Sequence, residues 1–69
     1  MNAHSIFDPP AYSITEFCKT HRIGRGMFYK LRAAGEAPLV VKLGRRSIIT
    51  GEAAAAWRQE QMAKAQEQS

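Results

Sequence analysis

The chain has 69 residues, one cysteine and a formal net charge of +4, which indicates one small domain with a marginal core and no internal disulfide. Its cysteine and two histidines lack zinc-binding spacing, and the sequence contains no paired carboxylates, nucleophile constellation or phosphate-binding loop. No apolar run approaches the roughly 20 residues of a membrane span, and the N-terminus has no signal-peptide pattern. We therefore expect a cytoplasmic protein that is not an enzyme and uses no cofactor or metal.

The positive charge is concentrated in the middle of the chain. Residues 13–50 contain eight Lys or Arg against two Glu, whereas residues 1–12 and 51–69 each carry a net charge of −1. Such a basic stretch is typical of nucleic-acid binding. An anionic membrane is a weaker partner, because no segment combines a basic face with a broad apolar one.

Residues 1–11 are predicted to form a flexible arm, because Asp8-Pro9-Pro10 favours extended backbone and cannot continue a helix. Ile6 and Phe7 are its apolar residues. They can cover the core, lie loosely at the surface or bind a partner.

The next stretch, from Ser13 to Gly35, predicts two short helices joined by a tight turn. Ser13 and Glu16 have the spacing of a capping box, and Tyr12 and Phe17 are placed to pack together across the start of the helix. Three residues are expected on its inward face: Phe17, Cys18 as a small core residue, and His21 at the edge of the core.

The second helix breaks two local rules. Arg25 in its first turn is disfavoured by the helix dipole by about 0.3–1 kcal/mol, and Gly26 costs about 0.8–1 kcal/mol relative to alanine. Both residues make sense if a polyanion lies against this helix end. With Ile23, Phe28 and Leu31 inward, the outward face consists of Arg25, Gly26, Tyr29, Lys30 and Ala33. The alternative is an ordinary solvated charged face.

After Gly35, β-branched residues and one glycine predict a hairpin. Gly44-Arg45 suits a two-residue type II′ turn, which sets Val41 opposite Ile48 and Val40 opposite Ile49. Either pair can face the core. The tip carries Lys42, Arg45 and Arg46, which suit a phosphate backbone or simply keep an edge hairpin soluble.

Thr50 is the expected cap of a third helix, with Glu52 favourably placed in its first turn. Its inward stripe is Ala53, Ala54 and Trp57, of which Trp57 is the largest apolar side chain of the chain. The helix is expected to continue for one or two turns, with residues 65–69 as a disordered tail. Met62 and the alanines are an alternative surface for self-association.

The resulting fold class is mainly α with a two-stranded hairpin, a winged helix-turn-helix over residues 12–64. From about Tyr12 to Arg58 the chain resembles the AlpA-type regulators and excisionases of phages and integrative elements, whose winged-helix domain is akin to the MerR DNA-binding region. The matching stretches are Ser13-Ile14-Thr15-Glu16-Phe17-Cys18, Phe28-Tyr29-Lys30-Leu31-Arg32, Val41-Lys42-Leu43-Gly44-Arg45-Arg46 and Ala53-Ala54-Ala55-Ala56-Trp57.

The chain departs from this family at the turn between the first two helices. The family commonly has glycine before the Ile23 position and serine at the helix cap, where this chain has Arg22 and Gly24. Glycine is a workable helix cap at a cost of roughly a few tenths of a kcal/mol, so we expect the fold to be retained. Arg22 adds a potential phosphate contact.

The resemblance implies that the second helix enters the major groove of double-stranded DNA and the hairpin lies on the adjacent backbone or minor groove. Arg25, Gly26, Tyr29 and Lys30 are then the groove residues, with Arg25 best suited to guanine. The residues assigned to phosphates are Arg22, Lys42, Arg45 and Arg46.

The expected function is that of an excisionase or an AlpA-type transcription regulator, which residues alone do not separate. We expect several copies on repeated DNA sites, association with the nucleoid when bound, and an integrase or recombinase as a further partner. The alternative is a protein-interaction adaptor on the same scaffold.

Overall fold

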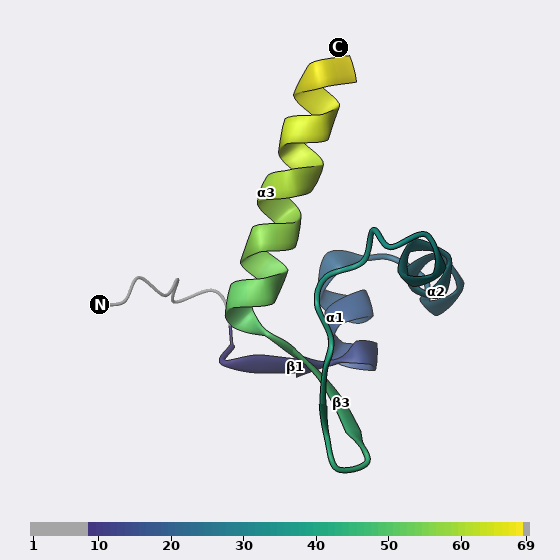
Figure 1. Ribbon diagram of the computed structural model, residues 1–69, viewed down its shortest axis with the longest axis vertical. Helices are drawn as coiled ribbons and strands as arrows, with labels where there is room; N and C mark the ends of the chain where they lie inside the picture. The colour runs from purple at the N-terminus through teal and green to yellow at the C-terminus, as the bar shows by residue number, and fades with distance from the viewer. Residues whose placement is uncertain (1–8, 69) are drawn as a thin grey trace.

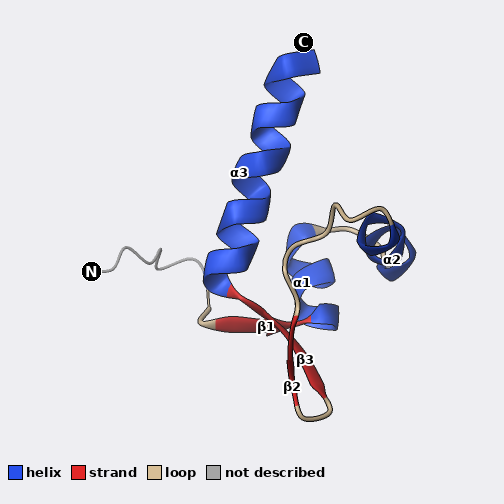
Figure 2. Cartoon of the chain, viewed as in Figure 1, coloured by secondary structure: helices blue, strands red, loops and turns tan. Residues whose placement is uncertain are grey.

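The computed structural model describes residues 9–68, which form three helices and a three-stranded antiparallel sheet, a small mixed α/β domain (Figures 1 and 2). No helix within this range is long and apolar enough to cross a membrane. The elements in chain order are β1 (Ala11–Ser13), α1 (Ile14–His21), α2 (Arg25–Ala33), β2 (Val41–Leu43), β3 (Arg46–Thr50) and α3 (Gly51–Gln68).

The predicted capping box is present at the start of α1. The Ser13 amide donates to Glu16 Oε1 at 2.9 Å, and the Glu16 amide donates to Ser13 Oγ at 3.0 Å. Next to the cap, the rings of Tyr12 and Phe17 meet edge to face with centroids 5.8 Å apart. The two interactions together fix the angle at which the chain enters α1.

The β2–β3 hairpin has the predicted register, with Val41 opposite Ile48. Gly44 has φ +62° and Arg45 has no positive φ, as a type II′ turn requires. Ile49 is fully buried and Val40 packs against the core, so this pair faces the helices. Val41 and Ile48 consequently lie on the outer face of the sheet.

The two-stranded sheet of the predicted fold class is incomplete, because β1 adds a third strand beside β3. Tyr12 pairs with Ile49, and the Gly51 amide donates to the Pro10 carbonyl at 2.9 Å. Three residues are too few to show an alternating pattern, which is why the sequence did not reveal this strand. The predicted arm therefore ends in ordered structure at Ala11, while Ile6 and Phe7 lie outside the described residues.

The core is a small aromatic cluster between the sheet and the helices. Phe17, Phe28 and Ile49 are fully buried, together with Tyr12, Cys18 and Ala54. Trp57 is half-buried, packs against this core with its ring 5.4 Å from that of Phe17, and donates from Nε1 to the Glu36 carbonyl at 2.8 Å. It thereby attaches the segment after α2 to α3.

His21 joins α1 to α3 at the edge of the core. Its ring stacks on Phe17 at 4.0 Å, Nδ1 donates to the Phe17 carbonyl at 2.9 Å, and Nε2 accepts from Arg58 Nη1 at 2.9 Å. Because a carbonyl only accepts and a guanidinium only donates, these two contacts assign the donor role to Nδ1 and the acceptor role to Nε2. His21 is therefore the core-edge residue that the sequence predicted.

Thr50 caps α3 as expected, since its Oγ1 accepts from the Ala53 amide at 3.0 Å. The predicted tail is wrong in one respect, because the helix continues through residues 65–67 and ends at Gln68. Alanine, lysine, glutamine and glutamate are good helix formers, and neither glycine nor proline follows Trp57 to stop the helix. The C-terminal half of α3 projects from the rest of the domain (Figure 1).

We predict that Trp57→Ala lowers the free energy of unfolding by about 3–5 kcal/mol, because it removes a large core side chain. Trp57→Phe keeps most of the ring and should cost mainly the hydrogen bond to Glu36, about 0.5–1.5 kcal/mol. Met62→Ala, at a side chain that is 58% exposed on the same helix, should change stability by less than about 0.5 kcal/mol. Urea unfolding followed by circular dichroism measures all three. Equal losses at Trp57 and Met62 would contradict this role for Trp57.

Candidate nucleic-acid interface

The N-terminus of α2 is open to solvent. Gly24 is its N-cap and provides no side-chain hydrogen bond, and the first turn of α2 contains no acidic residue. A Cβ added at Gly24 or Gly26 would have no neighbour within 4 Å. The backbone N–H groups of this turn can therefore be approached closely by an external anion.

The residues of α2 divide as the sequence predicted. Phe28 is buried, Ile23 packs against the core just before the helix, and Leu31 is half-buried. The Tyr29 ring lies edge-on to the Phe28 ring, with centroids 5.4 Å apart, and Tyr29 is 44% exposed. The outward residues are all exposed: Arg25, Gly26, Tyr29, Lys30 and Ala33.

Met27 is an addition that sequence reasoning missed. Its side chain is 51% exposed in the first turn of α2, beside Gly26. Met27 lies one turn before Leu31, at the edge of the inward stripe, so helical spacing alone does not predict this exposure. It adds an apolar contact to an otherwise basic helix end.

Arg22 occupies a strained position in the turn between α1 and α2. It is the C-cap of α1 and has φ +59°, the left-handed conformation that glycine adopts most readily. A side chain in this conformation costs roughly 1–2 kcal/mol. Arg22 is exposed and directly precedes the Ile23-Gly24 entry to α2 in the chain.

The basic residues of the hairpin do not form one cluster. Lys42, Arg45 and Arg46 are all exposed, but Lys42 pairs with Ser47, whereas Arg46 pairs with Leu43. Side chains alternate along a strand, so Lys42 and Arg46 lie on opposite faces of the sheet. Arg45 lies in the turn at the tip.

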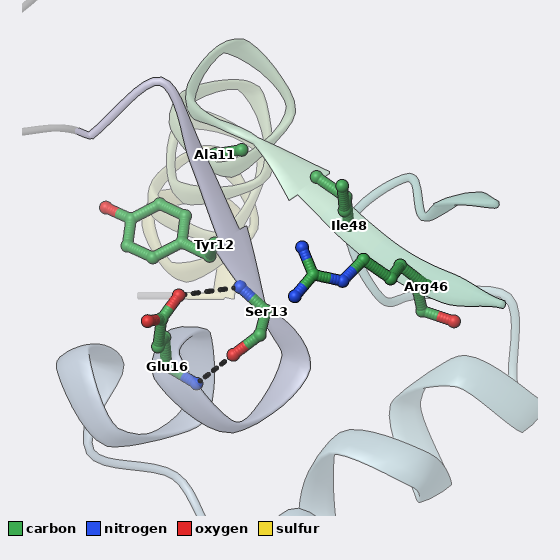
Figure 3. A pocket seen from close by; sticks show the side chains of 7 residues that line it. Ala11, Tyr12, Ser13, Glu16, Arg46 and Ile48 are labelled. Atoms are coloured by element: carbon green, nitrogen blue, oxygen red, sulfur yellow. Dashed lines mark hydrogen bonds between the residues drawn. The ribbon is translucent and has the colours of Figure 1, made fainter. Parts of the chain in front are cut away.

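Arg46 also points back along the sheet rather than beyond the tip. Its guanidinium extends toward Ser13 at the start of α1 (Figure 3). It lies in a shallow pocket of about 410 Å³ whose lining residues are Ala11, Tyr12, Ser13, Glu16, Arg46, Ser47 and Ile48. In Figure 1, α2 lies at the right of the view and the hairpin tip at the bottom, while α3 projects upward.

Neither the environment of Cys18 nor the arrangement of the acidic residues between positions 9 and 68 suggests a metal site or a reactive thiol. Burial raises the pKa of the Cys18 thiol, an effect that the positive charge of Arg25 partly opposes. A thiol with a raised pKa is a poor nucleophile, in keeping with a structural role. Among residues 9–68, no three His, Cys, Asp or Glu side chains are grouped so that they could hold a metal ion.

The open end of α2 and the exposed Arg22 before it provide backbone donors and a guanidinium group suited to phosphate, and the hairpin carries further cations on both of its faces and at its tip. No protein-family model, curated protein or solved structure matches the chain. What this surface binds is therefore inferred from the chain's own residues.

We predict that Arg22→Gly raises the free energy of unfolding by up to about 1 kcal/mol, since relief of the left-handed strain exceeds the entropy cost of glycine. Arg22→Ala retains the strain and should give no such gain. Thermal unfolding of the two variants measures the difference, and an equal or lower stability of Arg22→Gly would contradict the strain assignment.

We predict that Cys18 reacts slowly with iodoacetamide in the folded protein, because burial keeps its thiol protonated. The raised pKa also means that stability is fully present below the thiol's ordinary pKa and is lost as pH rises through the folded-state pKa. Mass spectrometry with and without urea measures labelling. Equal rates in both conditions would contradict a buried thiol.

Proposed function

We propose that this chain binds double-stranded DNA in a sequence-specific manner, with α1 and α2 as a helix-turn-helix and the β2–β3 hairpin as a wing. The observation that carries this proposal is the unobstructed N-terminus of α2. Its first turn combines Arg25, which the helix dipole disfavours, with Gly26, which leaves open space at the surface. A phosphodiester backbone beside this turn compensates both costs.

The proposed binding mode places the outward face of α2 in the major groove. The side chain of Arg25 is long, and its forked guanidinium can donate two hydrogen bonds to guanine. Lys30, about one turn later, donates to a second base or a phosphate. Gly26 allows the helix backbone to come close to the base edges. Tyr29, held edge-on by Phe28, adds a rigid polar contact.

The phosphate contacts in this mode come from Arg22 in the turn and from Lys42, Arg45 and Arg46 in the hairpin. These contacts position the domain without reading sequence. Arg45 and Lys42 at the tip are expected to contribute most. Arg46 lies beside Ser13, so it reaches a phosphate only where the DNA backbone passes along β1 or after its side chain rotates.

In a cell, the protein would act as an excisionase of a mobile element or as an AlpA-type transcription regulator. One domain of this size makes a small DNA interface, so several copies on repeated sites are proposed, with an integrase or recombinase as partner in the excisionase case. An excision assay with the element's integrase, run beside a promoter reporter, separates the two roles. Footprinting on the DNA upstream of the gene identifies the target.

We predict that changing Arg45 and Arg46 to alanine weakens binding to all DNA sequences alike. Each lost phosphate contact should lower the slope of log K against log salt by about 0.9. Affinities at several salt concentrations measure this slope, and Arg32→Ala, an exposed arginine outside the proposed surface, is the matched control. An unchanged slope would refute the wing assignment.

We predict that Arg25→Ala or Lys30→Ala relaxes the preference at individual base pairs, at roughly 1–3 kcal/mol for a good base contact. Binding-site selection on the variants and the parent chain measures this change. Arg22→Gly provides a contrast, because it should lower affinity for all sequences while stabilising the fold. The same selected motif for every variant would show that α2 does not read bases.

A further inference from the structure

A second surface lies along α3. It is a shallow groove of about 480 Å³ between α3 and the segment that precedes β2. We call it the α3 groove and define it by Pro38, Leu39, Glu52, Ala56, Trp57 and Glu60. Leu39 is 72% exposed, the highest value among the large apolar side chains of the described residues.

The charge of the α3 groove is opposite to that of the protein as a whole. Glu52 and Glu60, both exposed residues of α3, line it. None of the described residues in the groove wall is Lys or Arg. A basic chain that places two of its six acidic residues along one groove beside Leu39 and Trp57 has a surface suited to an apolar side chain flanked by cations.

The outer face of the hairpin has this complementary composition. Leu43 is 57% exposed and lies directly opposite Arg46 on the neighbouring strand. Val41 and Ile48, the next pair on the same face, are half-buried and extend the apolar area toward β1. We call this face, made of Val41, Leu43, Arg46 and Ile48, the hairpin face.

We propose that the α3 groove of one copy binds the hairpin face of a second copy. Leu43 would pack against Leu39 and Trp57, and Arg46 would pair with Glu52 or Glu60. In Figure 1 the hairpin extends away from α3, so a chain cannot fill its own groove. Because two different surfaces meet, each copy keeps one free groove and one free hairpin, and the assembly is open-ended.

The groove is shallow and the apolar contact is small, so the association is weak. We expect affinities of roughly micromolar to millimolar, as for small transient interfaces. The contact leaves Arg45 and the whole of α2 free. It involves no DNA, so it can be tested independently of the proposed function.

Sedimentation of the full chain without DNA, from about 10 µM to about 1 mM, tests this proposal. The average mass should rise with concentration above the 7.7 kDa of one chain, and the rise should shrink at high salt. Trp57, the only tryptophan, lines the groove and should report the same transition by fluorescence. A mass that stays at one chain over the whole range overturns the proposal.

Two variants separate the surfaces. The first variant combines Glu52→Gln with Glu60→Lys and alters the groove. Glutamine is chosen at position 52 because a cation in the first turn of α3 would oppose the helix dipole. The second variant, Arg46→Glu, alters the hairpin face. Alone, each variant should associate at least tenfold more weakly than the parent chain and should therefore remain monomeric where the parent chain begins to associate. Mixed together, they should form dimers that cannot grow, because the intact hairpin of the first fills the intact groove of the second.

Glu67→Lys and Arg32→Glu are the matched controls, since they make similar charge changes on exposed residues outside both surfaces. They should associate like the parent chain. Circular dichroism confirms that every variant folds. A titration with a single-site duplex measures DNA affinity separately, which Arg46→Glu is expected to lower through its proposed phosphate contact. Association that persists in both surface variants, or a mixture that stays monomeric, overturns the proposal; an association lost equally in the controls does so as well.

Discussion

The fold depends on the contacts of one buried side chain, Phe17. Its ring meets Tyr12 from β1 at 5.8 Å, Phe28 from α2 at 5.9 Å and Trp57 from α3 at 5.4 Å, and it stacks on His21 at 4.0 Å. One aromatic residue thus contacts the strand and the two helices around α1. Below roughly 80 residues a core has little reserve, so these few aromatic contacts determine where every surface residue is placed.

The departures from local stability rules gather in one short region. Arg22 has a left-handed conformation, Gly24 is a cap without a side chain, Arg25 opposes the helix dipole and Gly26 weakens the helix. The cap of α1 and the hairpin turn obey the same rules closely, so the departures are not general. Conflicts of this kind concentrate at functional sites, and these four residues lie in the turn between α1 and α2 and in the first turn of α2.

Strong local signals allowed much of this fold to be predicted. The capping box of Ser13 and Glu16, the glycine-first turn and the Thr50 cap each follow from a few neighbouring residues. Strand β1 and the direction of Arg46 depend on contacts with residues more than thirty positions away in the chain. Local sequence patterns do not report such contacts. For the same reason the sequence did not decide which face of the hairpin packs on the core, because either of its two apolar pairs can lie on that side. Met27 was missed because it lies one turn before Leu31, at the edge of the apolar stripe, where helical spacing does not decide exposure.

Amide chemical-shift mapping during titration with a duplex of arbitrary sequence at low salt tests the central claim most directly, because non-specific binding uses the same basic surface. The account predicts that the largest shifts fall on residues 22–30 and on the hairpin around 42–46, with the projecting half of α3 unchanged. Shifts centred on α3, or no shifts at all, would contradict it.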